Sequence, residues 1–451
     1  MKSTRQQRAW YWYDWANSAF ITTTSTVIMG PYLTALATQA ACPDLASGEV
    51  CGAPVQLLGF LPVLPGAVAP FVVTVATLVS AVLLVLIGAV VDRSPAPHRW
   101  LGGFAWSGAA AATAMFWLQG DTWALGAWLL VIASLCAGAS FVVYDSILCR
   151  IATPDERDRI SSRGWAFGYL GGGLLLALNL VLMSSYESFG LTYTLAIRLS
   201  LLSAGLWWAG FSFIPVVGLR RLPRAGLGEP VARPGVTAAG PFAQLAATFA
   251  GLRQFPNTGL FLVAYLFFND GIQTVISQSS LFATGELGLS TSQVMTAFLL
   301  TQFVAFGGAL LFGRLAGRLG AKRTVLLGLV MWLLVVVVAF FLPPGVFGWL
   351  LVLGSAIGLV MGGTQALSRS MYSQLVPKGR EAEYFSFYQA MERGTSWLGT
   401  LTFGLVFQAT QSYRFALVAL VAFFVIGGLL LTRVNMRQGI LDAGNELPRV
   451  M

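Results

Sequence analysis

Residues 88–93 read GAVVDR, and residues 313–318 read GRLAGR. Each hexamer begins with a glycine, ends with an arginine and comes at the end of a long apolar run. A second pair of similar segments, SILCRIATPDER at 146–157 and SMYSQLVPKGRE at 370–381, lies at the corresponding place further along the chain. The two pairs indicate that the chain consists of two repeated halves.

The composition is that of a helical membrane protein. Of the 451 residues, 56% are hydrophobic and only 10% are charged, against about 25% charged residues in ordinary soluble domains. Runs of about 20 apolar residues mark membrane-spanning helices. Counting such runs predicts twelve helices, at 9–38, 67–91, 101–118, 124–149, 164–184, 192–218, 257–282, 293–313, 324–342, 347–369, 384–408 and 414–432. The predicted fold class is an all-α polytopic membrane protein.

These helices divide the chain into an N-terminal six-helix half at 1–218 and a C-terminal six-helix half at 257–433. A connector at 219–256, rich in proline, glycine and arginine, lies between them, and a tail follows at 434–451. Within the connector, FAQLAATFAGLR at 242–253 predicts a short amphipathic helix on the membrane surface.

The charged loops predict the orientation. The chain carries a formal net charge of +9, and its basic residues gather in the loops on the side of the N-terminus. By the positive-inside rule, both termini should be cytoplasmic. The opposite loops contain Asp44, Glu49, Asp121, Glu187 and Glu286, with Arg198 and Arg414 as the basic residues near that face. The excess basic charge therefore indicates the lipid bilayer as a partner rather than nucleic acid.

Four further segments point to a family: YDWANSAF at 13–20, SSRGWAFGYLGGG at 161–173, YLFFNDGIQTVI at 265–276 and REAEYFSFY at 380–388. Together they resemble the signatures of the autophagy-related vacuolar amino-acid effluxers and their bacterial relatives. These proteins belong to the major facilitator superfamily, in which two parallel six-helix repeats enclose a substrate site near the midplane. The resemblance covers roughly residues 9–433. It implies a twelve-helix permease, with amino-acid efflux as the function associated with the fungal members.

The chain departs from the pattern of that family at two positions. Asp145 stands where asparagine is expected, and Gly317 replaces the acidic residue of the second loop motif.

Polar residues form a stripe on the first and the seventh predicted helices. On the seventh helix the spacing is i, i+3, i+4, i+7 and i+8, so the side chains share one face. Lipid offers polar groups no hydrogen bonds, so such a face must meet protein or water. We expect both stripes to line one aqueous cavity. The candidates for substrate binding or coupling are Asp14, Asn17, Ser18, Asn269, Asp270, Gln273, Thr274, Ser277 and Gln278. The alternative is hydrogen bonding between helices, at about 0.6 kcal/mol for each contact.

The remaining charges within predicted helices favour structural roles. Asp145 lies near the cytoplasmic end of the fourth helix, where pairing with Arg150 or Arg163 is the simplest account. Glu392 and Arg393 are adjacent on the eleventh helix and point to different sides, so each needs its own partner.

The repeated hexamers predict a latch between the halves. Gly88 permits close helix packing, and Asp92 is placed to reach the N-terminus of the eleventh helix, where the helix dipole favours a negative charge. In major facilitator proteins a similar contact holds the cytoplasmic side closed. Arg93, Gly313 and Arg318 complete the candidate latch. The alternative is that these charges only set the topology.

Cys42 and Cys51 flank a loop expected on the oxidising side of the membrane. A disulfide is therefore predicted, contributing about 2.5–3 kcal/mol by loop entropy, and two free thiols are the alternative.

Other chemistry is not indicated. The sequence has no GxxxxGKS or GxxxxGKT phosphate loop, and its single histidine, His98, lies in a predicted loop. No enzyme activity, cofactor or metal site is expected. We predict a secondary transporter in a bacterial inner membrane that moves small organic solutes, above all amino acids, by alternating access. Asp270 or Asp14 would bind the ammonium group, and Asp270 is the candidate proton carrier. The alternatives are export of drugs, peptides or envelope metabolites, and a receptor or scaffold that does not transport.

Overall fold

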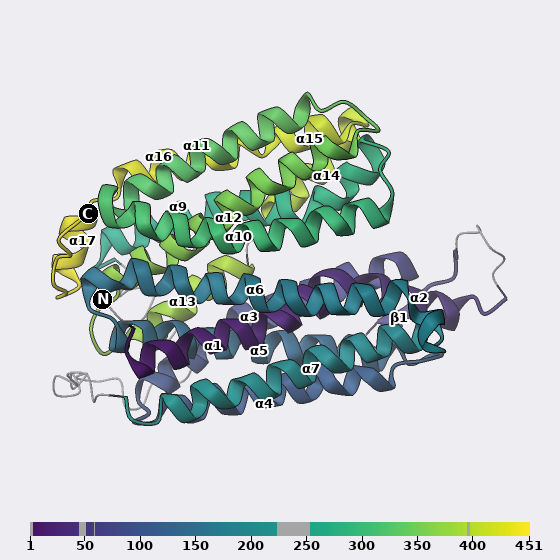
Figure 1. Ribbon diagram of the computed structural model, residues 1–451, viewed down its shortest axis with the longest axis horizontal. Coiled ribbons are helices and arrows are strands. Elements are labelled where there is room, and N and C mark those ends of the chain that lie inside the picture. Colours follow the sequence, from purple (N-terminus) through teal and green to yellow (C-terminus); the bar gives the residue numbers. More distant parts are fainter. Residues whose placement is uncertain (1–2, 45–50, 58, 223–252, 395–396) are drawn as a thin grey trace.

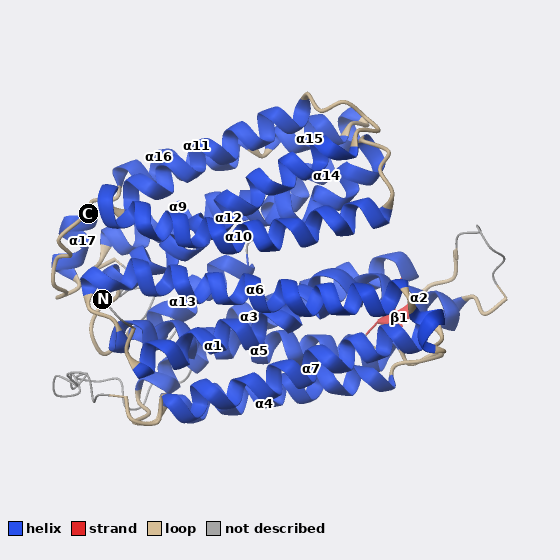
Figure 2. Cartoon of the chain, viewed as in Figure 1, coloured by secondary structure: helices blue, strands red, loops and turns tan. Residues whose placement is uncertain are grey.

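The computed structural model describes residues 3–44, 51–57, 59–222, 253–394 and 397–451. Almost all of these residues are helical (Figure 2). The amphipathic helix predicted at 242–253 lies, apart from its last residue, outside the described residues. Figure 1 shows two helical bundles side by side, with both chain ends at one end of the molecule. We call that end the terminal face and the other end the distal face.

The N-terminal half begins with a helix that has a π-helical middle part. This first crossing consists of α1 (Arg5–Ala19), η1 (Phe20–Ile28) and α2 (Met29–Ala41). A capping box starts α1, because Thr4 Oγ1 accepts from the Gln7 amide while Gln7 Oε1 accepts from the Thr4 amide. The other long helices are α3 (Pro65–Asp92), α4 (Pro97–Ala114), α5 (Trp123–Ile151), α6 (Arg157–Ser184) and α7 (Tyr193–Gly218).

The C-terminal half repeats this up-and-down path, with its last crossing divided at Leu420. Its undivided helices are α9 (Pro256–Leu281), α10 (Thr291–Leu319), α11 (Ala321–Phe340) and α12 (Phe347–Leu375). The eleventh predicted helix consists of α13 (Glu381–Gly394) and α14 (Trp397–Thr410), and the twelfth of α15 (Tyr413–Ala419) and α16 (Val421–Arg433). A short helix, α17 (Met436–Asp442), lies in the tail.

Nine helices within the described ranges are long and apolar enough to cross a membrane. The predicted spans at 9–38, 101–118 and 384–408 are not among them. The first crossing carries charged and hydroxyl side chains, and α4 begins with the polar residues His98 and Arg99. In the span at 384–408, residues 395 and 396 lie outside the described residues. All three still run the length of the bundles (Figure 1).

Each half has its own buried core. Trp10, Tyr13 and Trp208 are fully buried in the N-terminal half, and Tyr265 and Trp332 in the C-terminal half. Glycines bring helix backbones together within each half. A Cβ on Gly358 of α12 would lie 2.5 Å from a backbone oxygen of α10, and one on Gly362 would overlap another. Close contacts of this kind are the usual means of packing helices in lipid.

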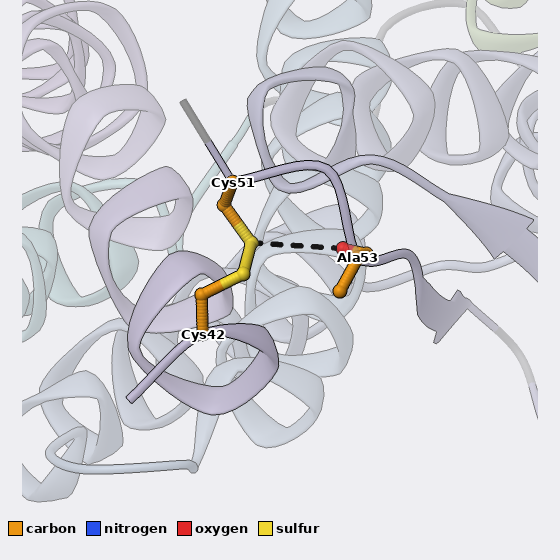
Figure 3. Close-up of a disulfide and its surroundings, with 3 residues drawn as sticks. All are labelled: Cys42, Cys51 and Ala53. Atoms are coloured by element: carbon orange, nitrogen blue, oxygen red, sulfur yellow. Dashed lines mark hydrogen bonds between the residues drawn. A yellow bond between two sulfur atoms is a disulfide. The ribbon is translucent and has the colours of Figure 1, made fainter. Parts of the chain in front are cut away.

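The described parts of the loop between the first two crossings, residues 42–44, 51–57 and 59–64, lie at the distal face. Cys42 and Cys51 are joined by a disulfide, and the Cys51 sulfur lies 3.7 Å from the Ala53 carbonyl oxygen (Figure 3). After it, β1 (Val55–Leu57) and β2 (Leu61–Val63) form an antiparallel hairpin in which Val55 pairs with Val63. Sequence patterns did not predict this hairpin.

Mass spectrometry of the non-reduced protein is expected to yield a peptide cross-linked through Cys42 and Cys51. Replacing both cysteines with serine should lower the free energy of unfolding by about 2.5–3 kcal/mol, because the unfolded chain gains loop entropy. Quantitative alkylation of both thiols without a reducing agent would contradict the disulfide.

Candidate functional site

A buried arginine joins the two halves. Arg369 lies six residues before the end of α12, and its side chain is only 3% exposed. Its Nη1 donates to Asp145 Oδ1 of α5 at 3.2 Å, and its Nη2 to Asp14 Oδ2 of α1 at 3.3 Å. Its Nε and Nη2 also donate to the hydroxyl and the carbonyl of Ser161 in α6, at 3.0 and 3.1 Å. All these partners belong to the other half. We call Asp14, Asp145 and Arg369 the charge cluster.

Aromatic rings enclose the guanidinium group of Arg369. Its central carbon lies 4.8 Å from the Trp10 ring centroid, 5.3 Å from that of Tyr144 and 5.4 Å from that of Trp165. A planar guanidinium suits such a site, because it stacks on aromatic faces while its edge binds carboxylates. Burying an ionised group without partners is very costly. Each of the three nitrogens of Arg369 donates at least one hydrogen bond, so the site can hold a buried charge.

Glycines of α6 make room for the aspartate of α1. A Cβ on Gly164 would lie 2.6 Å from Asp14 Oδ2, and one on Gly168 would lie 2.7 Å from the Ser18 hydroxyl. With this close approach, the Tyr144 hydroxyl donates to Asp14 Oδ2 at 2.7 Å. The glycines of the segment SSRGWAFGYLGGG therefore bring α6 against the polar face of α1.

The charge cluster continues into the C-terminal half through side-chain amides. Gln389 Nε2 of α13 donates to Asp145 Oδ2 at 2.9 Å and to Glu392 Oε2 at 3.2 Å. Asn269 of α9 accepts from Gln365 Nε2 of α12 at 3.0 Å, and its own amide lies 3.5 Å from the Glu392 carbonyl oxygen. Polar side chains therefore connect α1, α5, α12, α13 and α9 through the middle of the molecule.

The partner of Asp145 differs from the sequence-based expectation. Pairing with Arg150 or Arg163 was expected, but the ion pair is with Arg369, and Arg163 Nη1 donates to the Ser3 hydroxyl at 2.7 Å instead. The physical reason is that Arg150 and Arg163 lie toward the protein surface, whereas Arg369 of the facing half lies beside Asp145. Asp145 therefore pairs across the two halves rather than within the N-terminal half.

Asp92 contacts the first turn of α13. Its Oδ1 and Oδ2 accept from the backbone amides of Ala382 and Glu383, both at 2.8 Å. A Cβ on Gly88 would lie 2.5 Å from the Ala382 carbonyl oxygen, so only glycine lets α3 approach α13 this closely. A carboxylate on a helix N-terminus gains from unpaired amides and from the helix dipole.

The second hexamer makes the equivalent close approach without a carboxylate. A Cβ on Gly313 of α10 would lie 2.6 Å from the Cβ of Ser162 in α6, just as one on Gly88 would lie 2.9 Å from the Cβ of Ser386 in α13. A Cβ on Gly317, which replaces the acidic residue, would lie in open space. Arg93 and Arg318 are exposed at the helix ends.

Hydrogen bonds between the halves gather at the terminal face. Arg157 Nη1 donates to the Ser373 carbonyl at 2.6 Å, the Ser370 hydroxyl to Asp158 Oδ1 at 2.5 Å, and Gln374 Nε2 to the Pro154 carbonyl at 2.8 Å. In the tail, Arg449 forms an exposed ion pair with Asp155 at 3.4 Å. Arg198 and Arg414, near the distal face, bond only within their own halves in the described part of the chain. The terminal face is therefore closed.

Asp270 lies apart from the charge cluster, on another side of α9. Its Oδ2 accepts from the backbone amide of Gly399 at 2.7 Å, and Gly399 is the third residue of α14. Among the described residues, its Oδ1 has no hydrogen-bond partner. Asp270 thus joins α9 to the backbone of α14.

The other predicted site residues fall into two groups. Asn17 donates to the backbone oxygen of Tyr13, Ser18 packs against α6, and Thr274 packs against Gly399. These three contacts are between or within helices. Gln273 and Gln278 are half-buried, and Ser277 is exposed on the distal part of α9. The structure joins Asp14 and Asn269 through the polar network but does not bring Asp14 and Asp270 together.

The Asp270→Asn variant is expected to keep near wild-type thermal stability, because its amide oxygen still accepts from the Gly399 amide. The Asp270→Ala variant should lose about 1–3 kcal/mol of unfolding free energy, since a buried donor is left unsatisfied. Thermal unfolding in detergent measures both. If Asp270→Asn is stable but loses gradient-driven accumulation while retaining exchange, Asp270 carries the proton, and holding the Gly399 amide is not its main role.

Sequence reasoning missed Arg369, Gln365 and Gln389. The predicted helix ended at Arg369, which placed this residue at the membrane surface, whereas α12 continues to Leu375. One signal was present: Asp145 precedes SILCRIATPDER and Arg369 precedes SMYSQLVPKGRE, so the two opposite charges hold equivalent positions in the repeats.

Comparison with known sequences decides the family. The profile described as vacuole effluxer Atg22 like matches residues 2–157 and 153–444, which is nearly the whole chain. The chain belongs to the Atg22-like family. It is an MFS-type transporter, an integral membrane protein rather than an enzyme.

Curated relatives of this Atg22-like protein come from bacteria and fungi. The uncharacterized MFS-type transporter YxiO of Bacillus subtilis is 26% identical over 457 residues, which cover 99% of each chain. Autophagy-related protein 22-2 of Emericella nidulans is 26% identical over 490 residues, covering 88% of this chain and 81% of the relative.

Solved structures show the same fold. The proton:xylose symporter XylE superposes with a TM-score of 0.69 at 13% identity, covering 95% of both chains. The human organic anion transporter MFSD10 superposes with a TM-score of 0.63 at 15% identity, covering 95% of this chain and 99% of MFSD10. The predicted major facilitator fold is thus confirmed.

Proposed function

We propose that this Atg22-like protein moves amino acids across a bacterial cell membrane by alternating access, with protons as a candidate coupling ion. The halves at 1–218 and 257–433 are the moving units, joined by the connector at 219–256. In this structure the hydrogen bonds between them hold the terminal face closed. Transport then requires these bonds to break and re-form in each cycle.

The terminal face is proposed to be cytoplasmic, because the basic loops lie there. A cysteine introduced at Asp121, which is exposed at the distal face, should react with an impermeant thiol reagent in intact cells lacking Cys42 and Cys51. A cysteine at Arg437, exposed at the terminal face, should react only after the cells are permeabilised. The reverse labelling pattern would overturn this orientation.

The observation that carries the substrate proposal is the position of Arg369 opposite two carboxylates. An amino acid presents an ammonium group and a carboxylate a short distance apart. Asp14 and Asp145 have the charge to bind the ammonium group, and the guanidinium of Arg369 has the planar donor edge that binds a carboxylate. When the halves separate, these groups are released from one another and become available to a zwitterion.

Counterflow in proteoliposomes tests the function. Vesicles preloaded with a panel of unlabelled amino acids should take up the matching labelled amino acid when they contain the wild-type protein, and not when they contain Arg369→Met. Exchange of drugs or peptides but of no amino acid would contradict the proposed substrate. Absence of any exchange by correctly folded protein would favour a receptor or scaffold.

A further inference from the structure

One guanidinium group is paired with two carboxylates in the charge cluster. Arg369 Nη1 and Nη2 bind Asp145 and Asp14, which are 2% and 8% exposed. With all three groups ionised, the cluster has one more negative than positive charge. In a medium of low dielectric constant, such charges interact strongly and are expensive to leave without compensation.

The three groups are distributed unevenly over the halves. Both carboxylates lie in the N-terminal half, on α1 and α5, and the arginine lies in the C-terminal half, on α12. Movement of the halves at the terminal face must therefore withdraw Arg369 from both carboxylates at once. The two aspartates would remain together on one side, where the Tyr144 hydroxyl still donates to Asp14.

We propose that Asp14 and Asp145 form a cation site that takes up one positive charge, a proton or a substrate ammonium group, when the terminal face opens. This inference rests on the proposed alternating access and adds the groups that couple it to a cation. Arg369 acts as the internal cation of the closed state, and the incoming charge replaces it. Cation binding and opening are thus linked in one equilibrium.

Other charged and titratable groups face the cluster from every helix around it. They are Tyr13 on α1, Tyr144 on α5, Tyr169 on α6, Tyr265 on α9, and Tyr388 and Glu392 on α13. Arg157 and Asp158 bond to the end of α12, and Glu392 reaches Asp145 through Gln389. These surrounding groups are unchanged when Asp14 and Asp145 are replaced by asparagine. Variants of Asp14 and Asp145 therefore test the cation site separately from the surrounding groups.

Spin labels at Arg99 in α4 and Arg433 in α16, both exposed at the terminal face of opposite halves, report the opening. In full-length protein in nanodiscs, acidification should increase the long-distance population. If opening takes up one proton, the ratio of open to closed protein rises by up to about tenfold per pH unit. The variants are compared in an Asp92→Asn background, so that protonation of the Asp92 carboxylate on α13 does not itself open the face. In that background Asp14→Asn/Asp145→Asn should abolish the dependence, and Asp155→Asn, which removes an exposed carboxylate at the same face, should leave it.

A second series separates the two sources of positive charge at a fixed pH of about 8. Leucine and its analogue with a hydroxyl in place of the ammonium group are added in turn. If leucine opens the terminal face and the hydroxyl analogue does not, the cation is the ammonium group. If acid opens the face and leucine has no effect, the cation is the proton. Populations that respond to neither would overturn the inference, even if counterflow succeeds. If acid still opens the terminal face but no amino acid is exchanged in counterflow, the proposed substrate is wrong and the proposed cation site stands.

Discussion

The Arg369→Met variant is expected to lose transport and about 3–5 kcal/mol of unfolding free energy. Methionine fills similar space but leaves Asp14 and Asp145 buried without their guanidinium partner. The same change removes the bonds from Arg369 to Ser161 that help to close the terminal face. Thermal unfolding in detergent and counterflow in proteoliposomes measure the two losses.

Two further variants separate the role of charge from a general failure to fold. In Arg449→Met the ion pair that is lost joins the tail to the N-terminal half, but its side chains are 91% and 45% exposed, so its loss should cost less than about 1 kcal/mol. The Asp14→Asn/Asp145→Asn/Arg369→Met triple variant has no unpaired buried charge in the cluster. It should recover most of the stability while remaining inactive. Wild-type stability and transport in Arg369→Met would remove the cluster from the mechanism.

The Asp92→Asn variant is expected to shift the protein toward states that are open at the terminal face. Asparagine offers one acceptor oxygen where the carboxylate binds both the Ala382 and the Glu383 amides, and it lacks the negative charge that the α13 N-terminus favours. Loss of one charge-assisted bond, worth about 1.5–3 kcal/mol, corresponds to roughly a 10- to 150-fold change in the open-to-closed ratio. Distances between spin labels on the two halves measure this change.

A glycine pair provides an independent test of the same contact. In Gly88→Ala the new methyl group would overlap the Ala382 carbonyl oxygen, whereas in Gly103→Ala no atom lies within 4 Å of it. Only the first change should open the terminal face. Unchanged distance distributions in both Asp92→Asn and Gly88→Ala would show that this contact does not hold the halves together.

Local patterns predicted the fold well because each crossing buries a long apolar run. Their limit appears at the polar stripes. Asp270 belongs to the polar stripe of α9 and was expected to line a cavity, but its Oδ2 accepts from the backbone amide of Gly399 in α14. A polar stripe shows that a helix face avoids lipid, but it does not show whether the partner is substrate, water or another backbone.

The charge cluster was not predicted, and the reason is different. A charge within a membrane helix is tolerated only with a partner, and the partners here are hundreds of residues apart in the sequence, in opposite halves. Hydrophobic periodicity contains no information on such a contact. The internal repeat does, because Asp145 and Arg369 occupy equivalent positions, and equivalent positions near an axis of approximate two-fold symmetry lie close together.

Reversible cross-linking of the terminal face tests alternating access most directly. Asp158 in α6 and Ser370 in α12 are hydrogen-bonded across the halves, so cysteines at both positions, in a background without the native cysteines, can be joined by a short thiol-specific cross-linker. Alternating access predicts that cross-linked protein fails to exchange the labelled amino acid that the uncross-linked protein exchanges, and that cleaving the linker restores exchange. Undiminished exchange by fully cross-linked protein would contradict it.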